Sequence, residues 1–182
     1  MKNQSTKNIN YIIGILIILG LITRLLPHQP NFTPIGAIAI FGALYLPKKY
    51  AIIIPIITMI ISDLFIGLYS WQIMAAVYGS FIIMGLLGLW ARKNKNLGKI
   101  AGATLLGSII FFLVTNASVW AFGTMYPHSV SGLLESYYMA LPFFRNSLLG
   151  DIFYTTILVG TVEAIYYFQS KKIGLKHQSL TS

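Results

Sequence analysis

The chain has 182 residues, of which 56% are apolar and only 9% are charged, and its mean hydropathy is +0.73. Soluble domains carry about 25% charged residues, so this composition excludes an ordinary water-soluble protein. The net charge of +9 lies mostly in short segments between apolar runs, where membrane topology explains it, and we expect no nucleic-acid partner. Because cysteine is absent, disulfides and thiolate chemistry are excluded.

Six apolar runs follow one another along the chain. A helix rises about 1.5 Å per residue and must cross about 30 Å of hydrocarbon, so a span needs about 20 residues. The second run is short and is bounded by Pro34 and Pro47. We predict an all-α fold, a single integral membrane domain over residues 1–182, with six transmembrane helices at about 10–26, 34–47, 50–70, 71–91, 98–122 and 146–168.

Lysine and arginine gather at every second gap between these runs. Cytoplasmic loops of membrane proteins are enriched in Lys and Arg, so the alternation predicts the orientation of the chain. We expect a multi-pass protein of the inner (cytoplasmic) membrane with both its N-terminus and its C-terminus in the cytoplasm. The basic residues that carry this prediction are Lys2, Lys7, Lys48, Lys49, Arg92, Lys93, Lys95, Lys99, Lys171, Lys172 and Lys176.

Two of the connections expected on the outer side are unusual. Residues 27–34 contain three prolines and no Asp, Glu, Lys or Arg, which excludes a regular helix there. Residues 123–144 are too polar at their start to cross the bilayer and too apolar at their end to form a free loop. They predict a short outer interfacial helix near 131–142, closed by Pro142, that could cover the mouth of the bundle.

The few polar side chains inside the spans are expected at a common depth. Asp63 and Asp151 both lie about 10 Å below the outer surface when each residue contributes about 1.5 Å. Tyr78 and Asn116 fall at a similar depth. Arg24 lies close to that surface and its long side chain can reach the carboxylates. Intramembrane charges are costly, and they commonly mark functional sites.

An apolar pocket with a few placed polar groups is the usual composition of a small-molecule site. The alternative is that Asp63–Arg24 and Asp151–Arg145 are structural ion pairs and that Trp and Tyr form an interfacial belt. The candidate substrate-binding residues are Arg24, His28, Asn31, Phe32, Asp63, Tyr78, Asn116, Trp120, Tyr126, His128, Phe144, Arg145 and Asp151.

Catalysis and metal binding have little support in the sequence. The histidines lie in loops or in the C-terminal tail, so no paired histidines share a helix, and no serine has a histidine base at membrane depth. We therefore expect neither an enzyme, nor a metal site, nor a cofactor. Glu163 is expected to pair with Lys171 or Lys172. Small residues in the second and fifth spans are expected to pack within the chain or, alternatively, against a second membrane protein: Gly36, Ala39, Ala43, Ala103 and Gly107.

Several strings resemble a known, uncharacterised group of small bacterial membrane proteins that are described as transport proteins. The resemblance covers most of the chain and is carried by Arg24-Leu-Leu-Pro-His28, Pro30-Asn-Phe-Thr-Pro34, Ser62-Asp63, Thr115-Asn116, Tyr126-Pro127 and Pro142-Phe-Phe144. In size, span count and layout that group is similar to the substrate-binding S components of energy-coupling factor vitamin transporters, the cobalamin type among them.

This resemblance implies an outward-facing vitamin or nutrient site, with uptake driven by a membrane scaffold subunit and two ATPases. It also implies that small-residue faces of the first two spans meet the scaffold. The chain has no GxxxxGK[ST] loop of its own for ATP. The alternatives are a non-transporting membrane scaffold, whose polar cluster only holds helices together, and a solitary transporter or channel, which the apolar middle of the bundle disfavours.

Overall fold

A computed structural model of the protein describes residues 2–178, and it describes side chains over residues 8–171. The described chain is all-helical, as the sequence predicted. Its helices are α1 (Lys2–Leu25), α2 (Ile35–Tyr45), α3 (Tyr50–Ile66), α4 (Trp71–Lys93), α5 (Leu97–Phe122) and α6 (Val130–Gln178).

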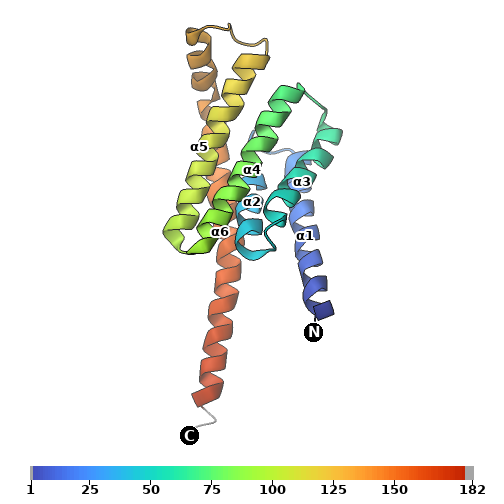
Figure 1. Cartoon of the computed structure of the whole chain (residues 1–182), viewed down its shortest axis with the longest axis vertical. Helices are drawn as coiled ribbons and strands as arrows, with labels where there is room; N and C mark the ends of the chain where they lie inside the picture. Colours follow the sequence, from blue (N-terminus) through green and yellow to red (C-terminus); the bar gives the residue numbers. More distant parts are fainter. Residues whose placement is uncertain (1, 179–182) are drawn as a thin grey trace.

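Consecutive helices run in alternating directions, so the ends of α1 and α6 nearest the termini lie at one end of the molecule (Figure 1). The α2–α3 and α4–α5 connections lie at this same end, which we call the basic end because it holds Lys48, Lys49 and Lys95. The opposite, far end carries the other three connections. Helices α1, α4, α5 and α6 are long and apolar enough to cross a membrane, and large apolar side chains such as Ile15, Leu64 and Leu106 are exposed on the outside.

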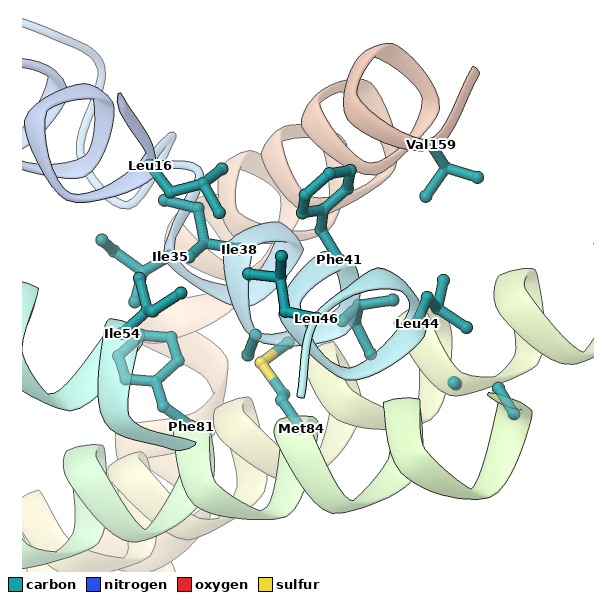
Figure 2. Packing of buried hydrophobic residues seen from close by; sticks show 14 of the residues in the cluster. Leu16, Ile35, Ile38, Phe41, Leu44, Leu46, Ile54, Phe81, Met84 and Val159 are labelled. Atoms are coloured by element: carbon teal, nitrogen blue, oxygen red, sulfur yellow. The ribbon is translucent and has the colours of Figure 1, made fainter. Parts of the chain in front are cut away.

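Helix α2 is the centre of the bundle. Every residue from Ile35 to Leu44 is buried, and the other five helices all contact α2. Figure 2 shows its side chains reaching Leu16 of α1, Met84 of α4 and Val159 of α6. An amphipathic pattern is absent from this helix because all of its faces meet protein.

The position of α2 explains how so short a helix is accommodated. Its 11 residues span only about 16 Å, roughly half the hydrocarbon thickness. Irregular backbone is tolerated at membrane depth where protein covers it. At the end of α2, the Arg92 guanidinium donates to the backbone oxygens of Ala43 (3.0 Å) and Leu46 (2.6 Å) and so satisfies carbonyls that lack a helical partner.

Small residues let the helices approach α2 and α4 closely. A Cβ at Gly88 would lie 2.6 Å from the Cβ of Ala43, and one at Gly107 would lie 2.7 Å from Cγ of Met84. Ala39, Ala43 and Ala103 are fully buried. The small residues of α2 and α5 therefore pack inside the chain, and the α2 face that was expected to meet a scaffold subunit is covered by the other helices.

Helix α3 ends earlier than the predicted span 50–70. Its last residue is Ile66, because Gly67 adopts φ 119°, a left-handed conformation that L-residues rarely adopt. Residues 67–70 form the connection to α4. Tyr69 is consequently a loop residue beside the far end of the bundle.

The separate interfacial helix predicted near 131–142 is not found. Those residues are the first turns of α6, a helix of 49 residues that continues through Pro142. The turns run alongside α5, where the Tyr137 hydroxyl donates to the backbone oxygen of Leu113 (3.0 Å) and the Phe112 ring contacts those of Tyr137 and Phe144. These aromatic contacts explain why the segment packs on α5 and extends the sixth predicted span at its outer end.

Glu163 has a different partner from the one expected. Its carboxylate accepts hydrogen bonds from Lys95 Nζ (2.5 Å), in the α4–α5 connection, and from the Tyr45 hydroxyl at the end of α2. Lys171 lies about two turns further along α6, beyond reach of the same oxygen. These two hydrogen bonds connect α6 with α2 and with the α4–α5 connection at the basic end.

Candidate functional site

Three polar side chains from three helices form a connected group near the far end. The Arg24 guanidinium, at the end of α1, forms an ion pair with the Asp63 carboxylate of α3, and it also donates to Sδ of Met59 (2.8 Å). The Tyr78 hydroxyl of α4 donates to the second oxygen of Asp63 (2.8 Å). Asp63 is 1% exposed, and both of its oxygens are occupied. The group binds α1, α3 and α4 together.

The second intramembrane acid, Asp151, has different surroundings. It lies on α6, is 4% exposed, and accepts a hydrogen bond from the Ser108 hydroxyl of α5 (2.7 Å) at Oδ2. Its Oδ1 lies beside Gly36, where an added Cβ would come within 2.3 Å of that oxygen. Glycine at position 36 therefore leaves the space that the carboxylate occupies.

A cavity of about 420 Å³ lies between these two groups at the far end of the bundle. That volume falls within the range of small-molecule sites, about 300–1,000 Å³. The walls come from α1 to α6 and from the α1–α2 and α3–α4 connections; half of the 14 lining residues are polar, but most of the wall surface is apolar. The lining residues are Arg24, His28, Pro30, Asn31, Thr33, Gly36, Met59, Ile66, Tyr69, Val77, Phe81, Phe111, Ser147 and Asp151.

A second, smaller cavity of about 220 Å³ adjoins the first. The two share the lining residues Asn31, Val77, Phe111 and Ser147. Asn116 and Phe144 line the second cavity, and the Asn116 amide also donates to the backbone oxygen of its own helix at Phe112 (2.8 Å). Asn116 and Phe144, both predicted as substrate-binding residues, thus line the second cavity and not the first.

The proline-dense connection between α1 and α2 is fixed in place over the first cavity. Asn31 has a positive φ of 64°, which Asn tolerates better than most residues. The Asn146 amide of α6 donates to the backbone oxygen of Pro30 (3.1 Å). Phe32 points away from the cavity lining and packs against the rings of Phe153 and Tyr154. Phe32, which was predicted as a substrate-binding residue, anchors this connection to α6.

Six other predicted site residues line neither cavity. Two of them, Asp63 and Tyr78, belong to the polar group around Arg24, and the other four are Trp120, Tyr126, His128 and Arg145. Trp120, near the end of α5, donates through Nε1 to the backbone oxygen of Pro127 (3.0 Å) and meets the His128 ring edge to face. It therefore packs on the α5–α6 connection, to which Tyr126 and His128 belong. Arg145 is exposed. It precedes Asp151 by six residues on one continuous helix, which separates the two side chains by about 120° around the axis and about 9 Å along it. The expected Asp151–Arg145 pair does not form.

Tyr69 supplies a further polar group to the cavity wall. Burial, and then the negative charge of Asp63, raise the pKa of its phenol to about 12, while the nearby Arg24 acts in the opposite direction. The hydroxyl is therefore protonated throughout the physiological pH range. It is available in the cavity as a hydrogen-bond donor.

Sequence reasoning missed Ser108, Ser147 and Gly36 as parts of the site. A signal for Ser108 exists, because Thr104, Ser108 and Thr115 recur at helical spacing on an otherwise apolar helix and all three are buried. The role of Gly36 had no such signal, since it depends on which helix faces α2 at that level. Among the described residues no group of three or more His, Asp or Glu side chains could hold a metal ion.

The fold and the cavity together define a small helical protein of the membrane class with a ligand-sized site near one end of its bundle. The chain belongs to DUF6580, a family of unknown function, whose model matches residues 4–173. Neither the comparison with curated proteins nor the comparison with solved structures finds a match.

Proposed function

We propose that the protein is a substrate-binding membrane component for the uptake of a small nutrient, which it binds in the cavity at the far end of the bundle. The observation that carries this proposal is the cavity itself, about 420 Å³ with mostly apolar walls and the polar groups of Arg24, Tyr69 and Asp151. Helix packing alone gives no reason to keep such a space between six helices, because protein interiors are close-packed.

The orientation follows from the basic end. With Lys48, Lys49 and Lys95 in the cytoplasm, the cavity lies in the outer half of an inner-membrane protein that crosses the bilayer six times and keeps both termini inside. A nutrient would then enter from outside. The volume suits a ligand of a few hundred daltons, which favours a small vitamin over a cobalamin.

An energising module is the second part of the proposal. The similarity in layout to energy-coupling factor S components supports a partnership with a membrane scaffold subunit and ATPases. Of the two helices expected to meet that scaffold, α2 is buried, whereas α1 exposes Tyr11, Ile15, Ile18 and Ile22 and has open space around Gly14. Helix α1 is thus the surface that we propose for docking, alongside contact with lipid.

One observation favours a second candidate, a non-transporting scaffold. Arg24, Asp63 and Tyr78 satisfy one another across three helices, as a purely structural cluster would. Such a protein would need no ligand in the cavity.

Native mass spectrometry of the protein purified from its own cells in mild detergent tests the proposal. We expect a bound molecule of a few hundred daltons that is lost from the Ser147→Trp variant, because Ser147 lines both cavities and the indole would fill them. Leu149→Trp is the matched control, since Leu149 is 48% exposed on the same helix and lines neither cavity. Wild-type protein that remains empty after incubation with a panel of vitamins would favour the scaffold.

A further inference from the structure

Asp151 is a buried acid without a cationic partner in the described part of the chain. The ion pairs among residues 8–171 are Arg24–Asp63 and Lys95–Glu163, and neither involves Asp151. The Ser108 hydroxyl is neutral and occupies only Oδ2. Arg145 is exposed and forms no ion pair with Asp151. Asp63, which is equally buried, has both a guanidinium and a phenol, so the two acids of the bundle differ in how well they are satisfied.

The unsatisfied oxygen of Asp151 faces the cavity. No donor among the described residues reaches Oδ1. The described side-chain atoms that are fully enclosed and lack a hydrogen-bond partner are Arg24 Nε and Thr155 Oγ1, and Oδ1 is not one of them. Oδ1 therefore keeps accessible surface. Asp151 and Gly36 both line the cavity, and Oδ1 occupies the space that a side chain at position 36 would take.

Asp151 has no counter-ion at the cavity among the described residues. The positive charge of Arg24 is already paired with Asp63, and its Nε is enclosed by protein. An ionised Asp151 carboxylate in a low-dielectric interior is energetically costly unless a cation compensates it. A positively charged or N–H-donating group at Oδ1 would supply both the missing hydrogen bond and the missing charge.

We propose that the ligand of this cavity is a small organic cation, anchored by its ammonium or protonated heterocyclic nitrogen on Asp151. Its body is aromatic or apolar, because Val77, Phe81 and Phe111 also line the cavity. This inference rests on the proposed function and narrows its substrate class. Ser108 positions the carboxylate through Oδ2 and leaves Oδ1 for the ligand.

Three matched probes test the charge preference. 2-Phenylethylamine, 2-phenylethanol and 3-phenylpropionate share a phenyl group and differ in being cationic, neutral and anionic. Their binding to the full-length protein in detergent is measured by titration calorimetry and by ligand-observed NMR. We expect the amine to bind at least tenfold more tightly than the alcohol, and the acid to bind most weakly.

Variants separate the anchor from the cavity. Asp151→Asn keeps the shape and a Ser108 partner, so it should remove the tenfold preference for the amine over the alcohol. Glu135→Gln is the control, since Glu135 is an exposed acid on the same helix. If Asp151→Asn fails to fold, Gly36→Ala provides the second test, because its methyl group would displace Oδ1 and should weaken amine binding selectively.

The outcomes distinguish this inference from the proposed function. Equal affinities for the three probes, or an unchanged amine preference in folded Asp151→Asn, would overturn the cation assignment. If Ser147→Trp still abolishes that unselective binding, the cavity stands as a ligand site. Absence of binding by all three probes to folded wild-type protein would count against both the cation assignment and the ligand-binding function.

Discussion

The Arg24–Asp63 pair offers a quantitative test of how the bundle is held together. Asp63 has a side chain only 2% exposed, and that of Arg24 is 18% exposed. Removing one partner of a buried ion pair costs about 3–5 kcal/mol, because the remaining charge is left uncompensated. Arg24→Met, which keeps the length of the side chain, should therefore lower stability by this amount. At roughly 2–4 °C per kcal/mol for a chain of this size, the midpoint should fall by about 6–20 °C.

Thermal unfolding of the purified protein in one detergent, followed by intrinsic fluorescence, measures this shift. Asp63→Leu should destabilise similarly, and the double variant Arg24→Met/Asp63→Leu should recover most of the loss, since neither charge then remains. Arg145→Met is the matched control and should change stability by less than about 0.5 kcal/mol, because Arg145 is exposed. Equal effects of the two arginine variants, or a double variant as unstable as the sum of its parts, would refute the reasoning.

Three further predictions concern packing, hydrogen bonding and topology. Gly88→Ala should destabilise the protein by about 1–3 kcal/mol through its clash with the α2 backbone, whereas Gly102→Ala, with nothing within 4 Å, should be neutral or stabilising by up to about 1 kcal/mol, both read from thermal unfolding. Tyr78→Phe should cost about 1.5–3 kcal/mol in the same assay, because it removes a hydrogen bond to a buried carboxylate; a loss below 0.5 kcal/mol would show that the bond contributes little. Since the chain has no cysteine, Thr124→Cys should react with a membrane-impermeant maleimide on whole cells, and Asn94→Cys only after permeabilisation; the reverse pattern would invert the proposed orientation.

The sequence predicted the helices better than it predicted their contacts. Hydrophobic length and basic clusters depend on local composition, so the all-helical fold and its helix order could be predicted directly. The interfacial helix was wrong because Pro142 was read as a terminator. In the structure its missing N–H is tolerated within α6, whose preceding turns are held against α5 by Tyr137 and Phe144.

The same distinction applies to the site. Depth along each span placed Arg24, Asp63 and Tyr78 close together, because depth follows from counting residues from a helix end. Rotation about each helix axis does not follow from such counting. The sequence therefore paired Asp151 with Arg145 and included Trp120 in the pocket, whereas helix rotation turns Arg145 outward and Trp120 onto the α5–α6 connection.

The enclosure of α2 sets the order in which this protein can be completed. Ribosomes deliver α2 second, yet its surface is covered in part by α6, the last helix, with Phe41 and Val159 both in the core. Contacts between segments so far apart in sequence form late in folding. Before α6 has been added, one face of the short helix α2 is not covered by protein. Truncation after α5 therefore removes the contacts that complete the core and leaves a partly folded chain that proteases and chaperones can recognise.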